Sequence, residues 1–215
     1  NKKSNYETDV FSPFIEYFEK VSGKKYTNSY DESATSDIAM RVVADHIRAV
    51  AFTIADGQIP SNTGAGYVIR RILRRAVRYN FSFLDIKEPF LHTIVPMLAD
   101  HFQDIFPELM AQKDQVAKII EGEEKAFLNT LAKGLKRLDS IIETDNKQIS
   151  GQKAFELYDT FGFPIDLTRL IASEKGLTID DKGFEIALAE QKDRARNAAQ
   201  KQVGDWFVLD EGESS

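Results

Sequence analysis

The chain has 215 residues, of which 42% are hydrophobic and 29% are charged, as in an ordinary globular protein with a core of its own. It contains no cysteine, which excludes disulfides and thiolate metal sites and fits the reducing cytoplasm, where we expect the protein to reside. No apolar run approaches the roughly 18–20 residues that cross a bilayer, so we expect no membrane partner. The chain begins at Asn1 without an initiator Met, and we expect it to be part of a longer protein.

The net charge of −6 argues against a nucleic-acid partner, but the charge is unevenly distributed. Residues 36–80 contain seven arginines, three aspartates and neither lysine nor glutamate, which gives this segment a charge of +4. The acidic character therefore belongs to the rest of the chain. A basic face on an acidic protein is a candidate binding site for a polyanion.

Helical periodicity dominates the sequence and predicts a mainly α fold. We expect helices at about 9–21, 37–55, 67–79, 89–102, 107–143, 151–158, 164–175 and 181–202. Gly23 ends the first helix and Gly57 the second, since glycine is typical just beyond a helix C-terminus. Pro96 predicts a bend in the fourth helix.

The segment 107–143 predicts one long helix, which at 1.5 Å per residue would reach roughly 55 Å. Gly122 and Gly134 weaken it. A coiled-coil dimer seam is an alternative, but the irregular apolar steps favour an internal spacer that links two helical halves. We expect a helical subdomain at 1–145, a second small helical subdomain at 146–203, and the start of a linker to a further domain at 204–215. Within this linker, residues 204–209 predict the beginning of a strand.

Five arginines fall within nine residues, namely Arg70, Arg71, Arg74, Arg75 and Arg78. In a helix they share one face, and the opposite face carries the apolar side chains expected in the core, namely Ile69, Ile72, Leu73, Ala76 and Val77. Arginine presents a planar fork of donors that matches phosphate oxygens in pairs. The alternative is that acidic residues of the same chain neutralise these arginines in ion pairs.

The loop 60–66 before this helix is rich in glycine and small residues, which favours a helix N-terminus whose N–H groups can meet a phosphate. It is not a Walker loop, because no lysine follows Gly66. A plain cap and turn is the alternative.

The runs Arg41–Arg48, Ala55–Gly57, Pro60–Asn62, Gly66–Arg78 and Leu157–Thr168 together resemble the tRNA-recognition region of bacterial alanyl-tRNA synthetases. The resemblance extends in order and spacing from about residue 6 to residue 202. It implies an irregular helical tRNA-recognition domain with the tRNA(Ala) acceptor stem as its partner, and neither DNA nor a membrane.

In that family an upstream class II catalytic domain joins alanine to its tRNA with ATP and Mg, and a downstream editing domain binds zinc through His and Cys. The resemblance makes these domains partners of the region seen here. This chain has no class II signature, and its histidines, His46, His92 and His101, lack cysteine partners and HxxxH spacing. We therefore expect no catalytic residue, cofactor or metal in this segment, and whether it acts as an enzyme by itself stays open.

The resemblance also implies that Asn62 and Asp159 recognise a G·U wobble pair near the end of the acceptor stem. The exocyclic amine of guanine is a minor-groove donor, and the wide A-form minor groove admits side chains. A carboxylate can accept from that amine, and an amide can both donate and accept. For an isolated Asn or Asp, a helix cap or Asx turn is the alternative.

The five arginines would then contact the tRNA backbone, although some of them could instead tie the two halves together. The chain departs from the family pattern at Ala65, where many relatives carry Arg, and this removes one candidate phosphate contact. Two other functions remain open: a helical scaffold for protein partners that binds no RNA, and a hydrolase or transferase with chemistry that the motifs do not reveal.

Overall fold

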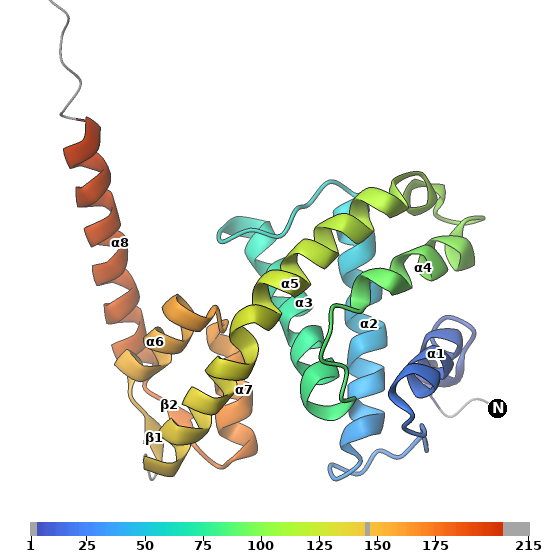
Figure 1. Cartoon of the computed structure of the whole chain (residues 1–215), viewed down its shortest axis with the longest axis horizontal. Helices are drawn as coiled ribbons and strands as arrows, with labels where there is room; N and C mark the ends of the chain where they lie inside the picture. Colours follow the sequence, from blue (N-terminus) through green and yellow to red (C-terminus); the bar gives the residue numbers. More distant parts are fainter. Residues whose placement is uncertain (1–3, 145–146, 204–215) are drawn as a thin grey trace, which may run out of the picture.

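The computed structural model describes residues 4–144 and 147–203, with side chains described as far as residue 196. This part of the chain is mainly α, as the sequence predicts, and is built from eight α-helices, two 3-10 turns and two short strands (Figure 1). The helices are α1 (Ser12–Ser22), α2 (Thr35–Ala55), α3 (Gly64–Phe83), α4 (Val95–Phe102), α5 (Pro107–Thr144), α6 (Gly151–Phe161), α7 (Ile165–Glu174) and α8 (Asp181–Val203). The 3-10 turns are η1 (Asn5–Glu7) and η2 (Leu91–Ile94), and the strands are β1 (Gln148–Ile149) and β2 (Thr178–Ile179).

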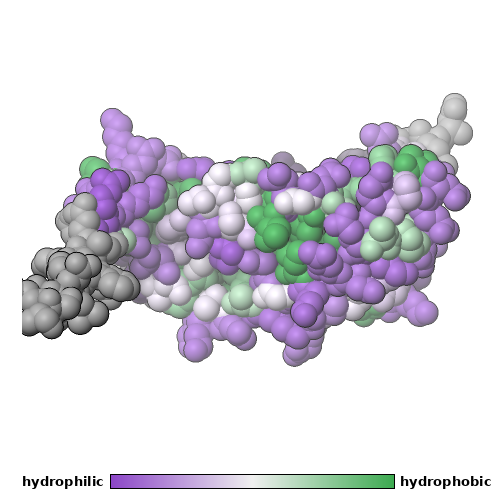
Figure 2. All heavy atoms as spheres, turned by 90° about the horizontal axis from the view of Figure 1, so that it is seen from above, coloured by the Kyte–Doolittle hydropathy of each residue, from purple (hydrophilic) through white to green (hydrophobic). Residues whose placement is uncertain are grey.

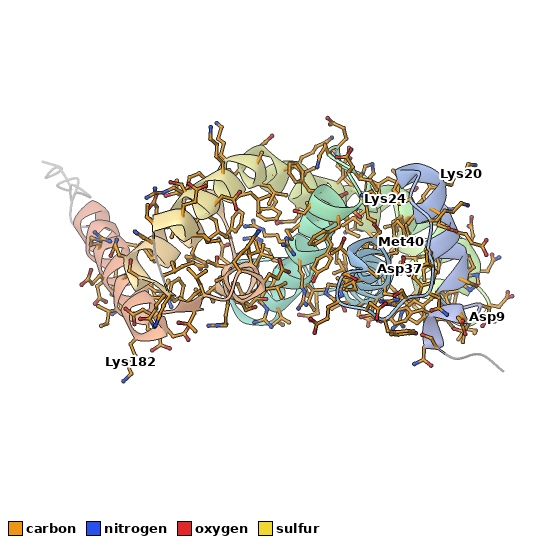
Figure 3. The ribbon with its side chains drawn as sticks, turned by 90° about the horizontal axis from the view of Figure 1, so that it is seen from below. Asp9, Lys20, Lys24, Asp37, Met40 and Lys182 are labelled. Carbon is orange, nitrogen blue, oxygen red and sulfur yellow. The ribbon has the colours of Figure 1, made fainter. Side chains whose placement is uncertain are left out.

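The first half of the chain packs around α2, which contacts α1, α3, α4 and α5. Apolar residues of α2 recur at helical spacing and are fully buried, among them Met40, Val43 and Ile47. The segment before α2 is held by Asp37, which lies in the first turn of this helix and is labelled in Figure 3. Its carboxylate accepts hydrogen bonds from the backbone N–H groups of Thr27 and Ser29. One buried carboxylate thus fixes an otherwise irregular loop.

The second half consists of α6, α7, α8 and the parallel pair β1–β2, in which Ile149 pairs with Ile179. The backbones of α6 and α8 are in direct contact near the starts of the two helices. A Cβ atom on Gly151 would overlap the backbone of Gly183 and Phe184, so this contact requires glycine. In Figure 1, α8 projects away from the body of the molecule at the end opposite to α1.

Helix α5 runs through both halves and contacts α2, α3 and α4 at one end and α6 at the other (Figure 1). Its apolar side chains stay buried along its length, from Val116 to Leu138. At the junction the ring of Phe127 meets that of Phe163 edge to face, with centroids 5.7 Å apart. The long helix predicted from the sequence is present and continuous, despite its two glycines.

Other elements differ from the prediction at their ends. Helix α3 begins at Gly64 rather than at 67. Thr63 has an extended backbone and precedes the helix, and the glycine-rich residues that follow it, 64–66, already form the first helical turn. Helix α6 continues to Phe161, and Gly162 ends it in the left-handed conformation with φ 68°. Pro96 does not bend a helix; it lies in the first turn of α4, where its missing N–H costs no hydrogen bond.

Strand β2 lies between the predicted helices 164–175 and 181–202, where the sequence predicted no strand. The strand predicted at 204–209 lies outside the described residues. None of the helices described is long and apolar enough to span a membrane. The face shown in Figure 2 is mostly hydrophilic, with one apolar patch near its middle.

Candidate nucleic-acid interface

The largest group of candidate residues meets at one cavity of about 510 Å³ between the start of α3, the end of α6 and the middle of α8. Its lining consists of Asn62, Thr63, Tyr67, Arg70, Arg74, Tyr158, Asp159, Gly162, Pro164, Leu188, Gln191 and Lys192. The structure therefore brings Asn62 and Asp159, which lie far apart in the sequence, into one cavity together with two of the five arginines.

Asn62 lies exposed in the turn that leads into α3. The turn is closed by a hydrogen bond of 3.0 Å from the N–H of Ser61 to the carbonyl of Gly66. A Cβ atom at Gly66 would overlap the carbonyl of Ile59 and the side chain of Ser61, so this close approach requires glycine. The Oδ1 atom of Asn62 accepts a hydrogen bond from Nη1 of Arg70.

Asp159 lies exposed in the last turn of α6, which Gly162 closes. Its carboxylate has no hydrogen bond or ion pair with any other residue that the structure describes. Thr130 of α5 donates a hydrogen bond of 2.8 Å to the carbonyl of Phe161, which holds this helix end against the long helix. The carboxylate is thus placed by a fixed helix end and is available to a ligand.

Arg70 and Arg74 reach the cavity from successive turns of α3 and share one carboxylate of α5. Oε1 of Glu123 accepts a hydrogen bond of 2.7 Å from Nη2 of Arg70, and Oε2 lies 3.6 Å from Nη2 of Arg74. Arg74 also donates to the carbonyl of Gly162 and lies over the ring of Phe127. Burial lowers the pKa of Arg74, and the carboxylate of Glu123 partly offsets this effect.

The other three arginines of α3 are not part of the cavity lining. Nε of Arg71 lies 3.3 Å from a carboxylate oxygen of Asp166 on α7, and burial raises the pKa of that carboxyl against the opposing effect of Arg71. Arg78 is buried, and its two terminal nitrogens donate to Glu174, also on α7, over 3.1 and 2.7 Å. Four of the five arginines therefore have an acidic partner, and all four pairs join the two halves or their linking helix.

Arg75 differs from the other four, because no carboxylate lies within ion-pair distance of it among the described residues. Its guanidinium lies 5.9 Å from the ring centre of Tyr79. It is also close enough to His46 of α2 to influence that residue: burial lowers the pKa of His46 most, and the positive charge of Arg75 lowers it further, against the opposing effect of Asp45.

Several residues at the cavity were not singled out by their sequence pattern. Tyr67 and Tyr158 both line the cavity, and burial raises the pKa of Tyr67. Gln191 and Lys192 come from α8, whose charged sequence reads as a solvated helix face. No local signal marks Lys192 or Glu123, because each is one of many charged residues on a long helix.

The histidines have structural surroundings. Nδ1 of His92 lies 3.1 Å from the buried carboxylate of Glu124, which also accepts hydrogen bonds from the backbone N–H groups at the start of η2. His101 packs edge to face against Phe14 and Phe102. Across residues 4–144 and 147–196, no group of three or more His, Cys, Asp or Glu side chains is arranged to hold a metal ion.

Comparison with known proteins gives the chain a family. It matches the family described as "tRNA synthetases class II (A)" over residues 1–212. It is 56% identical to an alanine–tRNA ligase of Flavobacterium psychrophilum in an alignment 214 residues long, which covers 97% of this chain and 24% of that relative. The alanine–tRNA ligases of Christiangramia forsetii and Porphyromonas gingivalis are 55% and 54% identical to it, over 97% and 99% of this chain and 24% of each relative.

The chain thus spans about a quarter of the length of these curated relatives. The family match nevertheless covers nearly all of the chain, including α3 with its arginines and the end of α6 that carries Asp159. The chain belongs to the family of class II (A) tRNA synthetases.

Proposed function

We propose that this chain docks the acceptor stem of tRNA(Ala) in the cavity between α3, α6 and α8, and reads a G·U wobble pair there. The observation that carries the proposal is the meeting of Asn62 and Asp159 in one cavity beside Arg70 and Arg74. The three relatives compared above are alanine–tRNA ligases, and they suggest the identity of the tRNA.

The two recognition residues offer complementary chemistry. Asp159 presents a carboxylate that has no partner among the residues that the structure describes. An ionised carboxylate can only accept, and the exocyclic amine of guanine is a donor in the minor groove. In Asn62 the amide oxygen is already engaged by Arg70, so its NH₂ group remains to donate to an acceptor on the base edge or to a 2′-hydroxyl. A donor and an acceptor at one cavity match the mixed edge of a G·U pair.

The arginines divide by accessibility in this proposal. Arg70 and Arg74 contact the backbone at the cavity, with Lys192 on the opposite wall. Arg71 and Arg75 extend the basic face outside it. Arg78 is buried and pairs with Glu174, so it holds α3 against α7. Its contribution to the contacts with the tRNA backbone is therefore to position α3. Such contacts orient the stem and carry no sequence information themselves.

We further propose that the parent protein is a cytoplasmic alanine–tRNA ligase that attaches alanine to tRNA(Ala) with ATP and Mg in a separate catalytic domain, and that a separate editing domain binds zinc. Among the described residues no group of three or more His, Cys, Asp or Glu side chains is arranged to hold a metal ion. That other parts of the parent bind ATP, Mg and zinc belongs to the same proposal. In this view residues 1–145 and 146–203 are the two helical subdomains of the recognition region, and 204–215 begin the connection to the next domain.

The first test is the binding of this chain to two acceptor-stem hairpins that differ only in a G·U or a G·C pair, at low and moderate salt. Tighter binding of the G·U hairpin supports the proposal. Equal, salt-sensitive binding would retain the basic face as an RNA contact but remove base recognition from this chain. Absence of binding even at low salt would reject RNA contact by this chain.

A protein scaffold is the alternative function, and it would need an apolar stripe on the exposed side of α5. The large hydrophobic side chains that are most exposed in the described residues are Val21, Tyr30, Ile59, Val68, Ile105, Phe106 and Ile186. None of them belongs to α5, which argues against a docking seam along the long helix.

A further inference from the structure

Glu123 occupies an unusual position on α5, because its single carboxylate faces two arginines of α3. The side chain is 17% exposed, and it lies 2.7 Å from Arg70 and 3.6 Å from Arg74. Each arginine uses its other terminal nitrogen, Nη1, for a second contact: Arg70 donates to Oδ1 of Asn62, and Arg74 donates to the carbonyl of Gly162.

These contacts form a continuous connection between the two walls of the cavity. One arm runs from Glu123 through Arg70 to the amide of Asn62. The other runs through Arg74 to Gly162, the residue that ends α6 just beyond Asp159. A Cβ atom at Gly162 would crowd Nη1 of Arg74, so the second arm fits closely against the helix end.

We propose that Glu123 is a positioning residue for base discrimination: it orients Arg70 so that the amide of Asn62 turns its NH₂ group to the RNA, and orients Arg74 so that the end of α6 presents Asp159. This inference rests on the proposed function. It gives an acidic residue a role in distinguishing G·U from G·C pairs, although a carboxylate beside a phosphate-binding surface is unfavourable for phosphate binding itself.

The physical reason is that Glu123 restrains the two cations while reducing their net charge. Without it, Arg70 and Arg74 repel each other and turn toward further phosphates, beyond those that they contact in the docked stem. Such contacts raise affinity for every RNA alike and bring no sequence information. With Glu123 in place, both guanidinium groups are held by two partners each, and the amide of Asn62 keeps one orientation. Loss of Glu123 should therefore weaken discrimination without weakening binding.

The test is the substitution Glu123→Gln, which keeps the side-chain shape and removes the charge. The ratio of G·U to G·C hairpin affinity is expected to fall at least about fivefold, the lower range for one good base contact. Affinity for the G·C hairpin is expected to stay level or to rise, with a steeper salt dependence. Glu121→Gln is the matched control, because Glu121 lies on the same helix, loses the same charge and pairs with Lys125 instead.

A double-mutant cycle separates positioning from general stabilisation. In the Asn62→Ala background, Glu123→Gln is expected to lower the ratio much less than it does in the parent chain, since the amide it orients is gone. If Glu123→Gln unfolds the chain in a thermal melt, Arg70→Met breaks the same connection from its other end and is likewise expected to lower the ratio of G·U to G·C hairpin affinity, while the lost cation lowers the affinity for both hairpins.

Three outcomes overturn the inference. An unchanged ratio in Glu123→Gln, while Asn62→Ala lowers it, rejects positioning by Glu123 and leaves the proposed function standing. An equal loss of affinity for both hairpins indicates a purely structural role. If Asn62→Ala and Asp159→Ala keep the ratio of the parent chain, the proposed function and this inference fall together.

Discussion

The side chain of Arg78 is 5% exposed and that of its partner Glu174 is 34% exposed, so the two members of this ion pair are not equivalent. Removing the arginine would leave a carboxylate that water can reach. Removing the carboxylate would leave a cation buried between α3 and α7. The partner nearer to solvent is therefore the more sensitive of the two positions.

We expect Glu174→Gln to lower the free energy of unfolding by roughly 1–3 kcal/mol, because it strands a buried charge. Chemical denaturation monitored by circular dichroism measures this change. Glu185→Gln, an exposed change on α8, is the control and is expected to stay within about 0.5 kcal/mol. Equal effects at the two positions would show that Arg78 is hydrated rather than dependent on its partner.

At the cavity, Asn62→Ala and Asp159→Ala are each expected to reduce the preference for the G·U hairpin by roughly 1–3 kcal/mol. Neither residue holds the fold, because Asn62 is an exposed turn residue and Asp159 has no partner among the described residues. Melting temperatures are therefore expected to remain close to that of the parent chain. Binding isotherms on both hairpins supply the measurement, and an equal loss on both would contradict base reading.

Lys192 tests the wall contributed by α8. Lys192→Ala is expected to weaken binding of both hairpins alike and to reduce the slope of log affinity against log salt by about one, the effect of one lost phosphate contact. Lys182→Ala is the matched control, because Lys182 lies on the same helix but outside the cavity and points away from the body of the molecule (Figure 3). Equal slopes in the two variants would remove α8 from the binding surface.

At the scale of elements, the glycines of α5 differ in their surroundings. Gly122 is exposed, and an added Cβ atom would meet nothing within 4 Å. Gly134 is buried, and an added Cβ atom would overlap the ring of Phe163 and lie 3.0 Å from Cβ of Phe161. Helix propensity alone predicts that alanine stabilises both positions.

We therefore expect the two glycine-to-alanine substitutions in α5 to change the free energy of unfolding in opposite directions. Gly122→Ala is expected to raise the free energy of unfolding by about 0.5–1 kcal/mol through lower entropy of the unfolded chain. Gly134→Ala is expected to lower it by about 1–3 kcal/mol through overpacking at the junction with α6. Thermal and chemical denaturation of both variants decides the matter, and stabilisation by Gly134→Ala would mean that the junction is loosely packed.

The contact between α2 and α3 predicts a pH dependence. The pKa of His46 is lowered in the folded state by burial and by Arg75, with Asp45 opposing them. The unfolded chain, with a histidine pKa near about 6.5, therefore binds the proton more tightly. The stability contributed by neutral His46 is fully present above that value and is lost as the pH falls through the folded pKa.

Between about pH 7.5 and about pH 5.5, the free energy of unfolding is expected to fall more for the parent chain than for His46→Gln. Denaturation at a series of pH values measures the difference between the two proteins. Parallel curves would show that His46 titrates as freely in the folded state as in the unfolded chain.

Much of the helical layout follows from local sequence, since apolar periodicity placed α5 within a residue of its observed bounds and Asp56-Gly57 marked the end of α2. The predicted bounds of α3 and the predicted end of α6 differ from the observed ones by several residues. At Gly64–Gly66 and at Asp159–Thr160 the composition is typical of a loop, but neighbouring helical turns and the cap at Gly162 extend the helices through it.

The strand pair and the ion pairs depend on tertiary contacts. The pairing of Ile149 with Ile179 involves strands of two residues, too short to show an alternating pattern. The sequence indicated both a phosphate-binding stripe and internal ion pairs for the arginines of α3. Which acid meets which arginine is decided by how α5 and α7 pack, as for Glu123 and Glu174, and no spacing within α3 reports that.

At the scale of the whole molecule, the candidate site belongs to neither half alone. Asn62 comes from the first half and Asp159 from the second, and α5 is packed against both. The ion pairs of α3 with α5 and α7 add polar contacts to the apolar junction at Phe127. The spacing between the two proposed recognition residues therefore depends on how rigidly the halves are joined.

The continuity of α5 makes helical phase a constraint on how this chain can change. One residue inserted between Glu123 and Gly134 would turn everything after it by about 100° and carry the end of α6 away from the turn that holds Asn62. Substitutions on the exposed side of the helix cause no such rotation. We therefore expect natural insertions and deletions to be absent from this stretch and to gather in the loops at either end of the helix, so that its length varies far less than its composition.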